Sequence, residues 1–141
     1  MFFGRYAYSL DNKGRLVLPA KFRQELGDVV FAMRGYEKCL SIYPAHSFEK
    51  LVQHIDQLSF HQKNARDFIR ASLASTIEMP LDSHGRIQIP SQTLAAYQFD
   101  KQLIVIGVND HLEIWTPQAY EAYEREVNEN YEAIAEGLDG K

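Results

Sequence analysis

Residues 8–19 read Tyr-Ser-Leu-Asp-Asn-Lys-Gly-Arg-Leu-Val-Leu-Pro, and residues 79–90 read Met-Pro-Leu-Asp-Ser-His-Gly-Arg-Ile-Gln-Ile-Pro. Both stretches fit the frame Leu-Asp-x-x-Gly-Arg-apolar-x-apolar-Pro, and the second copy lies 71 positions after the first (82 − 11). A frame this specific, found twice in 141 residues, indicates two copies of one supersecondary unit. The pattern therefore predicts a fold built by internal duplication.

The segments around each copy also correspond. Apolar residues alternate within both motifs, at Leu16 and Leu18 and at Ile87 and Ile89, which predicts strands with one buried face. Each motif is followed by a short segment, an apolar run and a second alternating run, and a proline closes the motif strand because it cannot donate to a ladder. Each unit therefore reads strand, turn, strand, short helix or turn, strand, turn, strand.

Helical patterns follow both units. Residues 47–58, residues 65–77 and the stretch that begins at Pro117 space their apolar side chains at about 3.6 residues. The last of these carries its stripe on Tyr120, Tyr123, Val127, Tyr131 and Ile134. The sequence thus predicts a mainly β protein with flanking helices, of the α+β class.

Composition excludes several classes of protein. Cys39 is the one cysteine, which rules out an internal disulfide framework and fits a reducing cytoplasm. No apolar run approaches the roughly 18 residues of a membrane span, and no signal-peptide pattern opens the sequence. Five scattered histidines show no metal-ligand spacing, and no nucleotide-binding or hydrolase motif occurs. We therefore expect no metal, no cofactor, no small-molecule substrate and no enzyme activity.

Charge is unevenly distributed along the chain. The net charge is −4, yet residues 1–24 hold five basic residues against one acidic residue, and residues 118–141 hold seven acidic against two basic. The local field, rather than the net charge, steers a polyanion toward a protein. A basic front and an acidic tail are therefore compatible with a nucleic-acid partner.

The repeated motif has the residues of a tight turn. Gly14 and Gly85 can adopt a positive φ without steric cost. Asp11 and Asp82 can accept hydrogen bonds from backbone N–H groups across the turn. We expect these four residues to shape the loops.

The arginine of the motif is not needed for a turn. Arg15 and Arg86 are the basic residues that both copies share, and a guanidinium matches a guanine edge or a phosphate with two parallel donors. Residue chemistry alone leaves two interpretations open. Each arginine contacts nucleic acid, or it is an exposed or intramolecularly paired charge.

The sequence resembles the MraZ family, a group of bacterial transcriptional regulators of the AbrB-like, swapped-hairpin class. The resemblance rests on the doubled motif, the opening Met-Phe-x-Gly, the Leu-Pro-Ala-Lys-Phe-Arg segment and Gly-x-x-x-His-Leu-Glu-Ile-Trp near the end, and it covers nearly the whole chain. It implies a pseudo-twofold tandem of AbrB-like half-barrels that interlock within one chain, each followed by helix. The expected units are a first repeat at 5–47, connecting helices at 48–77, a second repeat at 78–121, and an acidic C-terminal helix and tail at 122–141.

The resemblance also implies a function. Proteins of this family bind double-stranded DNA at short G-rich direct repeats upstream of the division and cell-wall gene cluster, and they assemble into closed homo-oligomeric rings. For this chain it implies a cytoplasmic, nucleoid-associated regulator. Repression is the expected mode, because a protein that covers a promoter blocks it.

Site residues follow from the same resemblance. It implies that Arg15 is the main DNA reader, that Lys13 and Arg5 contact the DNA backbone, and that Arg86 occupies the matching place in the second copy. The second copy is less basic, since His84 stands where the first has lysine, so we expect the first repeat to dominate DNA contact. The alternative is an antitoxin-like protein–protein module that binds its partner through the acidic C-terminal helix.

Overall fold

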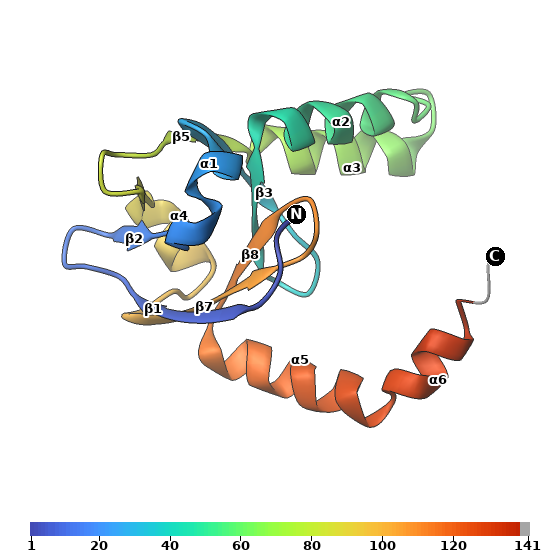
Figure 1. Ribbon diagram of the computed structural model, residues 1–141. Helices are drawn as coiled ribbons and strands as arrows, with labels where there is room; N and C mark the ends of the chain where they lie inside the picture. Colours follow the sequence, from blue (N-terminus) through green and yellow to red (C-terminus); the bar gives the residue numbers. More distant parts are fainter. Residues whose placement is uncertain (139–141) are drawn as a thin grey trace.

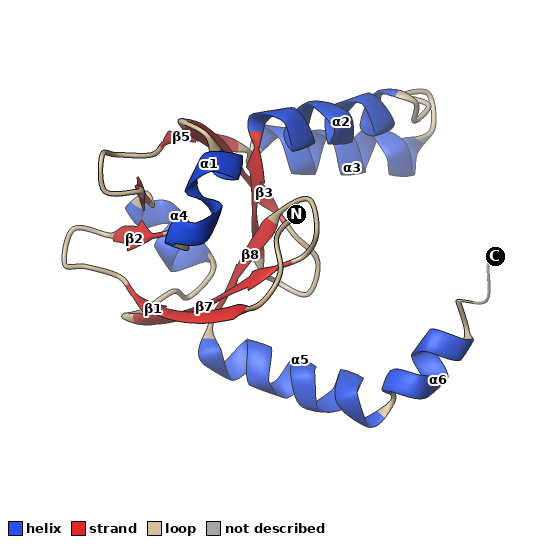
Figure 2. Ribbon diagram, viewed as in Figure 1, coloured by secondary structure: helices blue, strands red, loops and turns tan. Residues whose placement is uncertain are grey.

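The computed structural model describes residues 1–138 and is mainly β with flanking helices (Figure 2). The strands are β1 (Arg5–Ser9), β2 (Arg15–Val17), β3 (Val29–Arg34), β4 (Leu40–Pro44), β5 (Ile77–Pro80), β6 (Arg86–Gln88), β7 (Gln102–Gly107) and β8 (Leu112–Trp115). The helices are η1 (Ala20–Phe22), α1 (Arg23–Leu26), α2 (Ala45–Asp56), α3 (Lys63–Ala74), α4 (Ser91–Ala96), α5 (Pro117–Glu129) and α6 (Tyr131–Glu136). The predicted α+β class is confirmed.

The two repeats exchange strands. An antiparallel six-stranded sheet has the order β1-β7-β8-β4-β3-β5, and β2 pairs with β6 in a separate two-stranded ribbon. In this sheet Tyr6 of β1 lies opposite Val105 of β7, and Val30 of β3 lies opposite Met79 of β5. Each repeat therefore contributes its first strand to the other repeat, which confirms the predicted interlocked tandem.

A pseudo-twofold axis relates the repeats. Leu16 lies opposite Ile87 at the centre of the β2–β6 ribbon, and these residues occupy the same place in the repeated motif. Ser41 lies opposite Glu113 at the centre of the β4–β8 pair, again at equivalent positions. The axis passes through both pairs, so the ribbon and the sheet share one centre of symmetry.

The main core lies between the ribbon and the sheet. Leu16 and Ile87 of the ribbon and Val30 and Val105 of the sheet are completely buried in one hydrophobic cluster. Full burial of an aliphatic side chain contributes roughly 1.5–3 kcal/mol. The alternating motif residues are thus the inward face of the ribbon, as the period-two pattern predicts.

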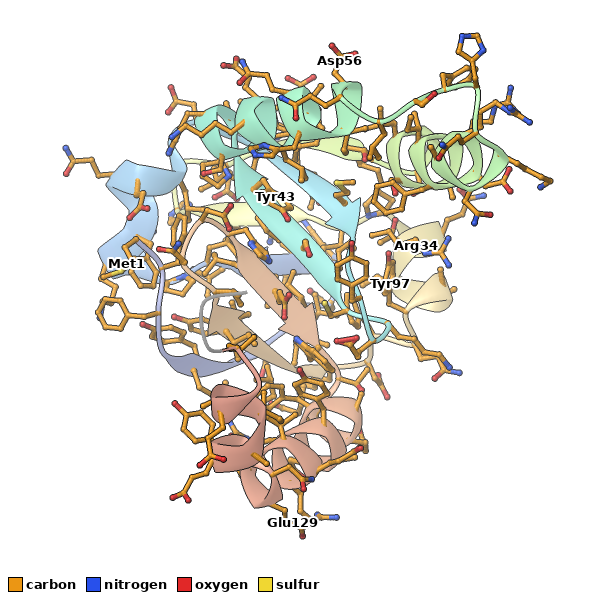
Figure 3. All side chains as sticks on the ribbon, turned by 90° about the vertical axis from the view of Figure 1, so that its right-hand side faces the viewer. Met1, Arg34, Tyr43, Asp56, Tyr97 and Glu129 are labelled. Atoms are coloured by element: carbon orange, nitrogen blue, oxygen red, sulfur yellow. The ribbon has the colours of Figure 1, made fainter. Side chains whose placement is uncertain are left out.

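Two helices at equivalent places pack on the other face of the sheet. On α2, Phe48 stacks on Phe31 with ring centroids 4.4 Å apart. On α5, Tyr120 and Tyr123 lie against Trp115, at 5.4 and 5.1 Å between centroids. Figure 3 views this face, with α2 above the sheet and α5 below it. Each half-barrel is therefore followed by a helix that packs on the sheet strands of its own repeat.

Two helix predictions need correction. Helix α3 ends at Ala74, and Ile77 begins β5 because it pairs with Ala32. The C-terminal stripe is divided at Asn130 into α5 and α6, and Tyr131 and Ile134 of α6 are exposed. Residues 139–141 of the predicted 122–141 segment lie outside the described residues.

None of the helices within residues 1–138 combines the length and the apolar character that crossing a bilayer requires. The unit boundaries predicted from the sequence stay a prediction.

Candidate nucleic-acid interface

The two motif loops project from one end of the molecule. In Figure 1 the β1–β2 loop and the β5–β6 loop extend to the left, while α2, α3, α5 and α6 lie on the other side. The helices α5 and α6 carry six glutamates and one arginine. The strongly acidic part of the described chain is therefore well separated from the loops.

Asp11 organises the first loop. Its Oδ1 accepts hydrogen bonds from the backbone N–H groups of Lys13 and Arg15, both at 2.9 Å. The N–H of Gly14 donates to the Asp11 carbonyl at 3.1 Å, and Gly14 has a φ of 75°. These are the roles expected for the aspartate and the glycine of the motif.

Asp82 repeats the arrangement in the second loop. It accepts from the N–H groups of His84 and Arg86, both at 2.9 Å, and Gly85 has a φ of 73°. The hydrogen bond from the Arg86 backbone N–H is the main cause that lowers the pKa of Asp82 to about 2, and the corresponding bond from Arg15 lowers the pKa of Asp11. Both carboxylates are therefore charged at neutral pH and hold their loops firmly.

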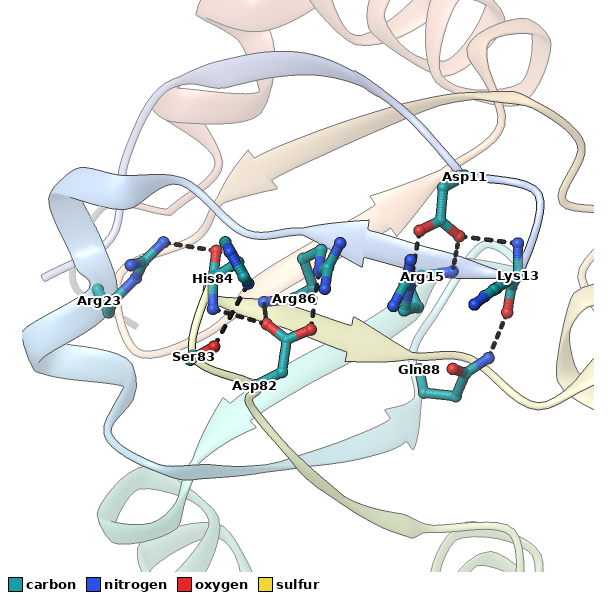
Figure 4. Close-up of polar contacts among 9 residues, drawn as sticks. All are labelled: Asp11, Lys13, Arg15, Arg23, Asp82, Ser83, His84, Arg86 and Gln88. Atoms are coloured by element: carbon teal, nitrogen blue, oxygen red, sulfur yellow. Dashed lines mark hydrogen bonds and ion pairs between the residues drawn. The ribbon is translucent and has the colours of Figure 1, made fainter.

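Each aspartate also orients its arginine. The Nε of Arg15 donates to Asp11 Oδ2 at 2.6 Å, and the Nε of Arg86 donates to Asp82 Oδ2 at 2.7 Å (Figure 4). Within residues 1–138 the terminal nitrogens of both guanidinium groups have no hydrogen-bond partner. The two interpretations left open by the sequence are thus compatible, because pairing at Nε leaves two adjacent donors for a ligand.

The ribbon places the two arginines side by side. Leu16 and Ile87 point into the core, so Arg15, Arg86 and their neighbours two positions along each strand lie on the outer face. Arg15 lies opposite Gln88 and Arg86 lies opposite Val17, which makes the arginines diagonal neighbours, about 7–8 Å apart at Cα. The outer face of β2–β6 is one surface with two guanidinium groups.

The two loops are held to the ribbon differently. The Lys13 carbonyl accepts a hydrogen bond from Gln88 Nε2. The His84 carbonyl instead accepts one from Nη2 of Arg23 at 2.8 Å, and Arg23 belongs to α1 of the first repeat. The second loop therefore has a cation from the first repeat, which a comparison of the two motifs does not predict. The repeat offset alone contains no signal for this contact.

Arg5 lies apart from the loops. It sits on β1, where its Nη1 pairs with Glu124 of α5 at 2.9 Å and its guanidinium lies 5.1 Å from the centroid of the Tyr120 ring. These contacts fasten α5 to the edge strand. The structure brings Lys13, Arg15 and Arg86 together but does not bring Arg5 to them.

The described residues offer little for other chemistry. No group of three or more His, Cys, Asp or Glu side chains within 1–138 could hold a metal ion. Burial raises the pKa of Cys39 to about 12, which keeps its thiol protonated at neutral pH. The arginine-bearing ribbon is thus the best candidate site in the described part of the chain.

Comparison with known proteins points the same way. A family model described as "MraZ protein, putative antitoxin-like" matches residues 1–71 and 73–140. A protein named transcriptional regulator MraZ from Halothermothrix orenii is 38% identical over 99% of this chain and 97% of its own length. Proteins of the same name from Leuconostoc citreum and Lactiplantibacillus plantarum are 42% and 38% identical over 98% of this chain, and the matches cover 96% and 98% of those proteins.

Proposed function

Because the chain belongs to the MraZ family, whose relatives are named transcriptional regulators, we propose that it regulates transcription by binding double-stranded DNA through the outer face of the β2–β6 ribbon. The names of these relatives describe regulators and not enzymes, in agreement with the expectation from the sequence. The observation that carries the proposal is the pair of guanidinium groups, each fixed at Nε by an aspartate and open at its terminal nitrogens.

The ribbon has the architecture and chemistry of a DNA reader. The major groove admits a two-stranded β-ribbon, and a guanidinium donates two hydrogen bonds to O6 and N7 of guanine. Arg15 and Arg86 lie on the same outward face, while the loop residue Lys13 is exposed beside them. In the proposed complex the two arginines read guanines and Lys13 contacts a phosphate. Contact of Arg5 with the DNA backbone stays a prediction, and Glu124 competes for the same guanidinium.

Repeated sites would supply the affinity. One arginine–guanine pair contributes roughly 1–3 kcal/mol of discrimination, too little for a specific regulator. Linked sites raise apparent affinity by about 10²–10⁴-fold. We therefore propose that the chain forms a closed ring of identical subunits. The ring would bind G-rich direct repeats upstream of the division and cell-wall genes and repress their transcription.

The charge distribution supports the orientation of the proposed complex. The loops extend on the side of the molecule away from α5 and α6 (Figure 1). An acidic helix on the DNA side would repel phosphates, whereas on the far side its field is screened over a Debye length of about 8 Å. A net charge of −4 is thus compatible with DNA binding. A nucleoid location in the cytoplasm belongs to the same proposal.

The test is binding of the purified protein to labelled DNA from upstream of its own gene, beside a scrambled duplex of equal length. Arg15→Ala should abolish the preference for the native duplex and leave the oligomer size unchanged. Arg125→Ala, which removes an exposed arginine of α5, is the control and should bind as the wild type does. Equal binding of the wild type to both duplexes would refute sequence-specific regulation.

The contribution of Lys13 can be measured separately. Each lost phosphate contact reduces the slope of log affinity against log salt by about 1. Lys13→Ala should reduce the slope by that amount without changing the sequence preference. An unchanged slope would place Lys13 away from the phosphates.

A second candidate function is the antitoxin-like protein module. It is favoured by α6, where Tyr131, Ile134 and the following Leu138 are 65%, 48% and 70% exposed. An apolar stripe of this kind suits a protein partner. This function predicts a partner of fixed stoichiometry that is lost when Tyr131 and Ile134 are changed to serine, with DNA binding unaffected.

A further inference from the structure

The outer face of the ribbon is less symmetric than its backbone. The pseudo-axis relates Arg15 to Arg86, and it relates Val17 to Gln88 (17 + 71). The cross-strand pairs are therefore Arg15 with Gln88 at one end and Arg86 with Val17 at the other. Two like arginines thus have unlike partners.

We propose that Gln88 and Val17 give the ribbon a direction on DNA. The half with Arg15 and Gln88 reads a guanine next to an adenine, and the half with Arg86 and Val17 reads a guanine next to a thymine. This inference rests on the proposed function, since it concerns which bases the ribbon reads. It makes Gln88 and Val17 specificity-determining residues.

The chemistry of the two side chains supports different bases. The NH₂ of a glutamine amide donates to N7 of adenine while its oxygen accepts from N6, whereas an apolar side chain contacts the thymine methyl group. Gln88 is exposed, and its Nε2 donates one hydrogen bond to the Lys13 carbonyl. A second N–H and the Oε1 acceptor remain for a base. Val17 is half-buried and offers two methyl groups at the equivalent place.

The residues that pack against the two loops also differ between the halves. Arg23 covers the second loop so closely that a methyl group on Gly85 would overlap its guanidinium. The equivalent position in the second repeat (23 + 71) is Leu94, whose Cδ1 lies at ordinary contact distance, 3.4 Å from a methyl group on Gly14. The two halves of the interface therefore differ in support as well as in their reading residues.

A direction on DNA has a consequence for the binding site. A reader with true twofold symmetry binds a palindrome, because each half contacts the same bases. A reader whose halves differ binds a box that is not its own reverse complement.

The experiment is selection of bound duplexes from a randomised DNA pool with the full-length protein, followed by affinity measurements on the selected box. The wild type should select an asymmetric box. Val17→Gln gives both halves the same pair of reading residues and should shift the selected box toward a palindrome with adenine in both halves. Gln88→Val should lower the discrimination against a changed adenine by about 5- to 150-fold.

A charge-changing variant separates reading from structure. Gln88→Glu keeps the size of the side chain but removes its donors, so that only acceptors remain. A carboxylate accepts a hydrogen bond from N4 of cytosine. The preferred base at that position should change from adenine to cytosine, which a loss of structure would not produce. The control is Gln102→Val, which alters an exposed strand glutamine of β7 that accepts one hydrogen bond, from Ser9 Oγ at 3.2 Å.

The outcomes distinguish the two proposals. If the wild type selects no sequence, the proposed DNA-binding function fails. If the wild type selects a box and every variant at positions 17 and 88 selects the same one, the ribbon binds DNA but these residues give it no direction. Thermal unfolding of each variant, compared with the Gln102→Val control, shows that the selected proteins are folded.

Discussion

Replacement of Arg15 by lysine tests whether the shape of the guanidinium, and not its charge, reads DNA. In the structure the Nε of Arg15 bonds to Asp11 at 2.6 Å, which leaves two terminal nitrogens for a base. A lysine side chain has a single nitrogen and no planar fork of donors. It therefore cannot pair with Asp11 and donate two parallel hydrogen bonds to a base edge at the same time. The substitution should therefore remove one bidentate contact, worth about 1–3 kcal/mol. We expect affinity for the native box to fall by about 5- to 150-fold.

The assay is a fluorescence anisotropy titration of native and scrambled duplexes at three salt concentrations. Since lysine keeps the positive charge, the salt slope should match that of the wild type, and the loss should be confined to the native duplex. Arg125→Lys, on α5, is the matched control. Wild-type affinity and preference in Arg15→Lys would refute the reasoning, because the site would then require a charge alone.

Three further predictions concern stability. Leu16 is completely buried at the centre of the ribbon, so Leu16→Ala should lower the free energy of unfolding by about 2–5 kcal/mol, and a loss below 1 kcal/mol in urea unfolding would contradict the packing described. The pKa of Asp82 is about 2 in the folded chain against 3.8 ordinarily. Its stabilising contribution is therefore complete above pH 3.8 and is lost as the pH falls through 2. Asp82→Asn should remove this part of the acid dependence of the urea midpoint. Burial opposes protonation of His111, but hydrogen bonds with Glu113 and Asp110 outweigh it and raise the pKa. Its contribution is therefore complete below about pH 6.5 and is lost as the pH rises through the higher folded value, and His111→Gln should flatten the unfolding free energy across that range.

Local features of the fold could be predicted from the sequence. The hydrogen bonds of the Asp-x-x-Gly-Arg turn all lie within five residues. The roles of Asp11 and Gly14 therefore depend on contacts that any copy of the motif can form. The inward direction of Leu16 and Ile87 follows from strand alternation alone. Such features require no knowledge of which strands are neighbours.

Contacts between the repeats could not be predicted in the same way. Arg23 and His84 are 61 residues apart, and their contact depends on the strand exchange that brings α1 against the second loop. The proximity of Arg15 to Arg86 likewise depends on the register of β2 against β6. The sequence pattern places these arginines at two turns and says nothing of the distance between them.

The division of the C-terminal helix had no sequence signal of the usual kind. Asn130 is neither proline nor glycine, and the apolar stripe continues past it to Ile134. Before the break, Tyr120 and Tyr123 pack on Trp115, but after it Tyr131 and Ile134 are exposed. Periodicity predicts a face, whereas the surface available to that face decides how far the helix packs.

The strand exchange has a consequence for synthesis of the chain. Strand β1 emerges from the ribosome early, but its partner β7 begins at residue 102, which is 93 positions after the end of β1 (102 − 9). At about 5–20 residues per second, translation of that interval takes roughly 5–20 s. Until residue 80 has been made, the first repeat also lacks β5, the strand that pairs with β3. We therefore expect a nascent chain that acquires its fold only when nearly all of it has been made, so that a messenger cut between the two repeats would yield no folded half.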